Sequence, residues 1–306
     1  MKSRFFVVFL MLTISQAVLA QSSLDLLTVS GRYGFPQTAG EPIAAKNSEY
    51  GGLVNLKIPI VLSDKSIFYS EVSYLWSHVE SEADLGTAVA NPLDIKGYIL
   101  QTGLVQTLNE KQKLHLLFVP RFMSDGEVKS EDNWQFGGVV MFENRYNNDL
   151  MLRYGLLYNT ELFGPSLTPL LHVDWNINSK WSLAGLFPIS LKLAYQATES
   201  FSTGFSYFAL VTSYRLGTPE YEGDYVERRS IDLTAYARQK IVNNIFLEGR
   251  IGYAVGRSYS QYDEDDQLDF RIMILDFGDD RVAKNTMMKG GPIANLRLVY
   301  NLSFDN

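Results

Sequence analysis

Most of this chain alternates apolar and polar residues with a period of two between turn signals. In residues 150–158 every even position is Leu or Tyr, whereas Arg153 is among the odd positions. In residues 245–255 the odd positions are apolar or glycine, and Glu248 and Arg250 lie between them. Period two is the signature of a strand with two different faces, and no stretch has a convincing helical period. The sequence therefore predicts an all-β protein.

The connections between these stretches alternate between short and long. The short turns lie at 63–66, 109–112, 147–149, 176–180, 197–200 and 242–244. The longer loops lie at 36–48, 79–94, 124–133, 217–227 and 261–289. Such alternation is expected of antiparallel up-and-down hairpins that have one tight end and one elaborate end. We therefore predict an up-and-down antiparallel β-barrel.

The number of strands depends on the segment from Trp181 to Tyr195. Pro188 lies in the middle of it, and a proline cannot donate to a sheet ladder. We interpret the segment as a short hairpin that turns near Pro188, which gives about 14 strands with both termini at the short-turn end. If the two halves do not both pair, about 12 strands remain.

Alternation alone does not say which face of the sheet is wet. The strands reach about 10 residues or more, which is enough for a tilted strand to span a bilayer. Trp175 and Trp181 flank one short turn, whereas Trp76 and Trp134 lie near the long loops, as in the two aromatic girdles of a transmembrane barrel. We expect a transmembrane barrel; a soluble exported β-protein is the alternative.

The N-terminal residues have the pattern of an export signal. Lys2 and Arg4 precede an apolar run from Phe5 to Ile14, and small residues at 18–20 offer a cleavage site. We therefore expect a cleaved signal peptide over 1–20 and a single domain over 21–306. The chain has no cysteine, which excludes disulfides and a lipoprotein anchor at the cleavage site.

The last predicted strand, 295–304, alternates apolar with mostly polar residues and ends on an aromatic residue. Together with the export signal and the hairpin pattern, it resembles the Gram-negative outer-membrane β-barrel proteins, in particular porin-like barrels of an uncharacterised family. The resemblance implies an assembly signal at Tyr300, Leu302 and Phe304, although Asp305 and Asn306 follow the aromatic residue. It also implies an outer-membrane location and contacts with lipid, lipopolysaccharide and the barrel-insertion machinery.

The polar faces of the predicted strands carry many charges. A charge on the lipid face costs about 2–4 kcal/mol near the midplane, so we expect these side chains to face the interior. The lumen-lining candidates are Arg32, Lys57, Glu71, Lys96, Arg121, Glu143, Arg153, His172, Asp174, Lys192, Asp232, Arg238, Glu248, Arg250 and Arg297. They favour a passive, porin-like channel for small polar solutes; the alternative is a structural or surface-binding barrel whose lumen is filled.

No motif predicts catalysis, a cofactor, a metal or nucleic-acid binding. His172 and Asp174 share a face with Thr168 nearby, which would allow a lipid-modifying triad, but a solvated lumen histidine is the simpler interpretation. The acidic cluster of 263–266 with Asp269 lacks the glycine and ligand spacing of a calcium loop. We interpret it as a solvated loop and predict that the protein is not an enzyme.

Overall fold

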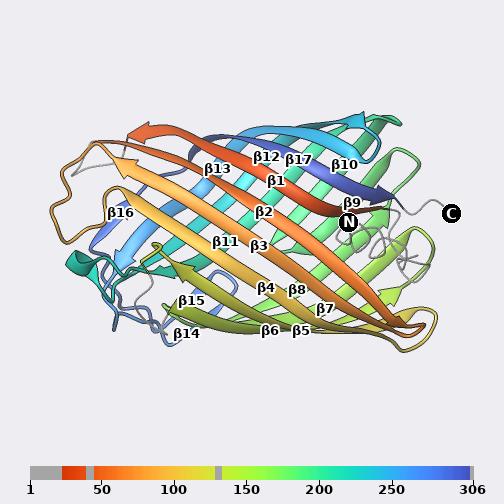
Figure 1. The fold of residues 1–306 in the computed structure, drawn as a ribbon, viewed down its shortest axis with the longest axis horizontal. Helices are drawn as coiled ribbons and strands as arrows, with labels where there is room; N and C mark the ends of the chain where they lie inside the picture. Colours follow the sequence, from red (N-terminus) through yellow and green to blue (C-terminus); the bar gives the residue numbers. More distant parts are fainter. Residues whose placement is uncertain (1–22, 39–44, 128–132, 304–306) are drawn as a thin grey trace, which may run out of the picture.

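The computed structural model describes residues 23–38, 45–127 and 133–303 as one closed sheet (Figure 1). Fourteen long strands form its wall. They are β1 (Ser23–Thr38), β2 (Lys46–Ser63), β3 (Ser66–Ser81), β4 (Leu93–Thr107), β5 (Gln112–Ser124), β6 (Trp134–Arg145), β7 (Leu150–Glu161), β8 (Gly164–Asn176), β9 (Trp181–Phe187), β10 (Ser190–Thr198), β11 (Phe201–Arg215), β12 (Tyr225–Val242), β13 (Ile245–Tyr262) and β17 (Gly291–Ser303).

Four small elements lie in the connections. A 3-10 turn, η2 (Pro219–Tyr221), follows β11, and three short strands lie between β13 and β17: β14 (Phe270–Ile272), β15 (Leu275–Phe277) and β16 (Asn285–Met287). The sequence did not predict these three strands. In the described part of the chain, no helix is long and apolar enough to cross a membrane.

The barrel closes by pairing its first strand with its last. β1 pairs antiparallel with β17 from Ser23↔Ser303 to Gly34↔Ile293, and each other long strand pairs with its neighbours in the chain. The start of β1 and the end of β17 therefore lie at the same end, which also carries the short turns; we call it the terminal end, and the opposite one the loop end. The predicted 14-strand up-and-down barrel, including the β9–β10 hairpin that turns at Pro188, is confirmed.

The outer surface of the barrel is apolar. Along the middle of the strands the outward positions are mostly hydrophobic and exposed, such as Val140, Leu156, Phe205 and Ile251, while the alternate positions are buried or partly buried. Aromatic side chains pack at the loop end, where the Phe122 and Trp134 ring centroids lie 5.4 Å apart. They also occur at the terminal end, where other strands place Trp175, Trp181, Tyr146 and Tyr154. An apolar belt between two aromatic girdles makes this a transmembrane β-barrel of the outer-membrane type.

The wall is not equally tall all the way round. The β9–β10 hairpin is short, so residues Gly164–Leu170 of β8 have no partner on β9. β14 takes the place of β9 there and pairs in parallel with β8, Arg271 against Ser166 and Ile272 against Leu167. A loop segment thereby satisfies backbone groups that would otherwise form an open edge.

The loop end is filled by a packed apolar core. The last residue of β11 pairs in parallel with the last residue of β5, Arg215 against Ser124, although β6–β10 lie between these strands in the ring. Side chains from opposite walls then meet in one cluster, which includes Ile95 of β4, Met123 of β5, Tyr214 of β11 and Met287 of β16, each at most 4% exposed. The lumen is therefore closed toward the loop end in this structure.

Candidate functional site

The polar part of the lumen lies at the terminal end, and two charge clusters dominate it. In the first, the Glu248 cluster, four cationic side chains converge on Glu248 of β13. Lys192 Nζ lies 2.6 Å from Oε2, and Arg297 Nη1 and Arg250 Nη2 lie 2.8 and 2.6 Å from Oε1. Arg238 is more distant, at 3.8 Å, and pairs mainly with Asp25 through two hydrogen bonds.

The second cluster surrounds Glu143 of β6 and is called the Glu143 cluster. Arg153 of β7 donates its Nε–H to Oε2 at 2.7 Å, and His115 Nε2 of β5 lies 3.1 Å from the same oxygen. Lys113 Nζ lies 3.8 Å from Oε1. In the ring of fourteen strands, β6 and β13 are separated by β7–β12 on one side and by β17 and β1–β5 on the other. The two clusters therefore face each other across the lumen.

In both clusters the carboxylate is hidden and the cations are accessible. The side chains of Glu248 and Glu143 are 0% and 3% exposed. Lys192, Arg297 and Arg153 keep 25%, 19% and 18% of their surface exposed. A solute at the terminal end of the lumen therefore meets a cationic surface with buried counter-charges behind it.

A third cluster lies nearer the loop end and has no such exposure. Glu49 of β2 accepts hydrogen bonds from Arg257 Nη1 at 2.9 Å and from the Tyr259 hydroxyl at 2.6 Å, and it also pairs with Arg32 of β1. Glu49 is 1% and Arg257 0% exposed. Arg32 continues to Asp232 of β12 at 3.1 Å. Buried ion pairs linking β1, β2, β12 and β13 brace the wall rather than contact solute.

The long β13–β17 connection is held by a further ion-pair network, which we call the loop clamp. Glu227 at the start of β12 pairs with Arg281 Nη1 at 2.8 Å and with Arg271 Nη2 at 3.2 Å. All three side chains are 1–2% exposed. Arg281 also pairs with Asp279 at 2.8 Å; this hydrogen bond lowers the pKa of the Asp279 carboxyl below its ordinary value of 3.8, against a smaller opposing effect of burial. The clamp fixes the loop over the mouth of the barrel.

The structure places the sequence-predicted lumen residues as follows. Fourteen of the fifteen share the inward face of their strands. Arg121 pairs with Glu161 at 2.8 Å below the apolar core, and Glu71 accepts a hydrogen bond from Asn55. Lys57 lies opposite Glu71 in the β2–β3 register. His172 and Asp174 of β8 also lie on the inward face.

Lys96 is the exception and lies on the outer face of β4. It is exposed, with the same parity as the exposed Tyr98 and Leu104, while its neighbours Ile95 and Gly97 are buried. Because side chains alternate along a strand, residue 96 cannot face inward when 98 and 104 face outward. Its place near the loop end leaves the ammonium at the edge of the apolar belt, where a charge is tolerated.

The structure also reveals charged residues of the ion-pair networks that the sequence did not single out. Asp25, Glu49, Lys113 and Glu161 pair with predicted charges. Arg228 and Arg257 join the cluster around Glu49, and Glu227, Arg271 and Arg281 form the loop clamp. Several have the same alternation signal as the predicted ones. The loop arginines have no periodic signal, because a loop has no face.

The residues considered for a catalytic triad and for a metal site have the following surroundings. His172 Nε2 is buried and has no hydrogen-bond partner in the described part of the chain. Two residues of the acidic cluster pair with cations: Asp263 with Lys284 at 2.7 Å and Glu264 with Arg215 at 3.2 Å. Among the described residues, no group of three or more potential ligands could hold a metal ion.

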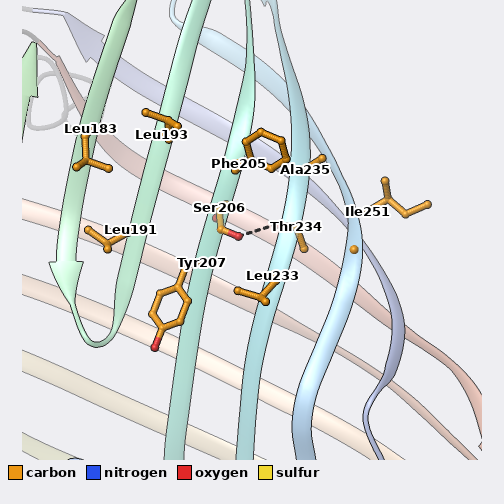
Figure 2. Close-up of a pocket in the computed structure, with 11 residues that line it drawn as sticks. Leu183, Leu191, Leu193, Phe205, Ser206, Tyr207, Leu233, Thr234, Ala235 and Ile251 are labelled. Carbon is orange, nitrogen blue, oxygen red and sulfur yellow. Dashed lines mark hydrogen bonds between the residues drawn. The ribbon is translucent and has the colours of Figure 1, made fainter. Parts of the chain in front are cut away.

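Two shallow grooves lie on the outside of the barrel and not in the lumen. The larger, of about 530 Å³, is lined by outward side chains of β9–β13, including Leu193, Phe205, Leu233 and Ile251 (Figure 2). These residues belong to the apolar belt. The groove therefore faces lipid and is not a solute site.

Comparison with family models finds one match. Residues 87–268, more than half of the chain, match the family described as a domain of unknown function, DUF6268. The chain belongs to the DUF6268 family. The matched region covers the wall from the β3–β4 loop through β13 and includes both carboxylates at the centres of the terminal-end clusters. No curated protein matches this DUF6268 chain.

Solved structures similar to this DUF6268 chain are outer-membrane barrels of low identity. The COG4313 outer-membrane channel from Pseudomonas putida F1 has a TM-score of 0.43 at 12% identity, over 91% of this chain and 97% of that one. The NanC porin has a TM-score of 0.35 at 9% identity, over 90% and 100%. The TodX monoaromatic hydrocarbon channel, as a deletion mutant, has 0.36 at 12%, over 91% and 89%. These values are too low to transfer a solute or a mechanism.

Proposed function

We propose that this protein is a barrel of the outer membrane that admits small polar solutes passively through its lumen. The supporting observation is the set of partly exposed charged side chains at the terminal end, led by Lys192, Arg297 and Arg153. Contact with water spares these charges the cost of burial, and it also leaves them accessible to a solute that enters the terminal end. Their exposure is what a solute-accessible vestibule requires.

The membrane placement follows from the outer surface. Its apolar belt would be in contact with lipid and lipopolysaccharide, and the short turns would face the periplasm with the loops outside. The export signal over 1–20 would bring the chain across the inner membrane. That segment and Phe304 lie outside the described residues, whereas Tyr300 and Leu302 of the proposed assembly signal lie in β17, the strand that closes the barrel. The insertion machinery would thus read the closing strand.

Passage requires a movement at the loop end. The apolar core fills the mouth in this structure, and the loop clamp holds the β13–β17 connection over it. The protein is therefore proposed as a gated passage that is closed at rest. Met287 and Met288 of that connection are part of the core, so its displacement would remove two of the side chains that fill the mouth.

Planar-bilayer recording of the refolded barrel tests the proposal. The wild type should open rarely, and a variant with residues 274–283 replaced by a short Gly-Ser linker, which keeps β14 on the edge of β8 but removes Arg281 of the clamp, should conduct for a larger fraction of time. Asp84→Asn, in the β3–β4 loop and outside the clamp, is the matched control and should behave as the wild type. If the loop-shortened barrel migrates as a folded, heat-modifiable species and never conducts, the proposal is refuted.

The second candidate is a structural or surface-binding barrel with no open pore. The packed core at the loop end favours it, because Val79, Met123 and Tyr214 are 0% exposed, as in the interior of a soluble domain. The same recording separates the two functions, since only the first expects conductance from the loop-shortened variant.

A further inference from the structure

The charge at the terminal end of the lumen differs in sign from the net charge of the whole chain. The chain as a whole has a formal charge of −7. In the Glu248 cluster, however, Lys192, Arg238, Arg250 and Arg297 share two carboxylates, those of Glu248 and Asp25. The terminal end of the lumen is therefore locally basic within an acidic protein, which is the opposite of what composition predicts.

We propose that Lys192, Arg250 and Arg297 form a binding site for small oxyanions, that is, solutes with a carboxylate or phosphate group. The inference deepens the proposed function and rests on it for access of the solute to the lumen. Carboxylates and phosphates are the groups that arginine guanidinium binds most specifically, because its planar donors match their oxygens.

Glu248 acts in this site as an organising group and not as a competitor for the solute. It is fully buried, and it draws three cations from three different strands, β10, β13 and β17, to one point. Without that carboxylate the three like charges would repel one another. Because it neutralises only one of them, a net positive charge remains on the side that faces the lumen.

The cations keep donors free for a ligand. A guanidinium has five N–H donors, and within the described residues Arg297 donates through Nη1 alone, to Glu248. Arg250 divides its donors between Glu248 and the Ser206 hydroxyl. Lys192 donates one ammonium hydrogen to Glu248 Oε2 at 2.6 Å and is also positioned by the Tyr236 ring, whose centroid lies 4.1 Å from Nζ.

The opposite wall of the barrel also contributes positive charge to the terminal end of the lumen. The Glu143 cluster places Arg153 and Lys113, 18% and 21% exposed, around a single carboxylate that is 3% exposed. It lies across the lumen, half a turn of the strand ring away. An anion that enters from the terminal end is thus attracted from two sides, whereas a cation is repelled from both.

Calorimetric titration of the refolded barrel in a non-ionic detergent tests the site, with succinate and inorganic phosphate as separate probes at constant ionic strength. The wild type should bind at least one of them, and the two arms separate a carboxylate from a phosphate preference. The double variant Lys192→Gln/Arg297→Gln should weaken binding by at least about tenfold, since each charged hydrogen bond contributes that much. Lys96→Gln, which removes an outer-face cation, should bind as the wild type.

Glu248→Gln provides the opposite sign and guards against misfolding of the double variant. The amide oxygen of the new glutamine can still accept hydrogen bonds from the cations, but the negative charge is lost and the repulsion between them is left for a bound oxyanion to relieve. A heat-modifiable Glu248→Gln barrel should therefore bind the oxyanion more tightly. No binding by the wild type, or equal binding by the wild type and the folded double variant, would overturn the inference. If the barrel binds the oxyanion but the loop-shortened variant does not conduct, the channel is refuted and the oxyanion site is supported. If the variant conducts but the barrel does not bind the oxyanion, the site is refuted and the channel is supported.

Discussion

Replacing Glu227 with glutamine should release the loop that covers the barrel. Glu227 is the only carboxylate within reach of both Arg271 and Arg281 among the described ion pairs, and all three side chains are nearly inaccessible to water. Breaking a buried ion pair by removing one partner costs about 3–5 kcal/mol when the other charge is left buried and unpaired. The lower end of this range applies here, because Arg271 keeps Asp276 and Arg281 keeps Asp279 as partners. At about 1.4 kcal/mol per factor of ten, the population of the displaced loop should rise roughly 10²-fold.

Limited trypsin digestion of the refolded barrel measures this population. When opening and closing are fast relative to cleavage, the rate of cleavage follows the fraction of open molecules. Cleavage after Arg281 or Lys284, mapped by mass spectrometry, should therefore accelerate in Glu227→Gln by about 100-fold. Glu264→Gln is the control: its side chain is 57% exposed and, among the described ion pairs, has Arg215 as its one partner, so its loss should change the rate by less than about fivefold. Equal rates in the two variants would refute the assignment of Glu227 as the anchor of the loop.

Three further predictions concern the wall, the pH response and assembly. Val140→Lys places a charge on the lipid face and should destabilise the bilayer-inserted barrel by about 2–4 kcal/mol in urea titration. Gln101→Lys, on the lumen face opposite Glu71, should cost under about 1 kcal/mol, and equal costs would contradict the assignment of faces. Because Arg281 lowers the pKa of Asp279 below 3.8, the stabilisation from this pair is fully present above about pH 4 and is lost as pH falls through the lowered pKa. Hydrogen exchange of the loop, corrected for intrinsic rates, should accordingly stay slow at pH 4 and accelerate at more acidic pH, and acceleration that begins near neutral pH would count against the clamp. Tyr300→Ala should lower the yield of heat-modifiable barrel in cells while leaving in vitro refolding nearly unchanged, and an equal loss in both would indicate a packing role instead.

The barrel itself could be predicted from the sequence because its cause is local. Alternation sets which side chains share a face, and turn residues set where each strand ends. Pro188 marked a hairpin that a count of apolar stretches alone would have merged into one strand. The inward position of charges such as Arg153 and Glu248 followed from the cost of placing them against lipid.

The filling of the loop end could not be predicted in the same way. Strands such as β3 and β4 extend beyond the apolar belt, and there the inward positions carry Val79, Leu93 and Ile95 in place of charges. Period two continues without interruption while the inner face changes from polar to apolar. Only contacts between strands far apart in the chain show that these side chains meet.

The loop clamp is invisible in the sequence for a related reason. Arg271 and Arg281 lie in a connection that is rich in aspartate, so composition predicts a solvated acidic loop. In the structure, two acids of this loop instead form ion pairs with arginines of the same loop: Asp276 with Arg271 and Asp279 with Arg281. The pairing of Arg271 and Arg281 with Glu227, at the start of β12, depends on the path of the loop, and the sequence pattern of a loop does not predict its path.

The segment of β8 near the loop end, which has no partner on β9, has a consequence for the order in which the barrel can be completed. Its backbone groups at Ser166 and Leu167 are satisfied by Arg271 and Ile272, roughly a hundred residues further along the chain. Such a distant contact forms late, because the chain between its partners must first be arranged. A barrel whose final hairpin has not yet docked would thus expose an unpaired strand segment beside the β9–β10 turn. The β13–β17 connection therefore covers a strand edge that was synthesised much earlier. A defect in that connection should first cause aggregation through the uncovered edge of β8.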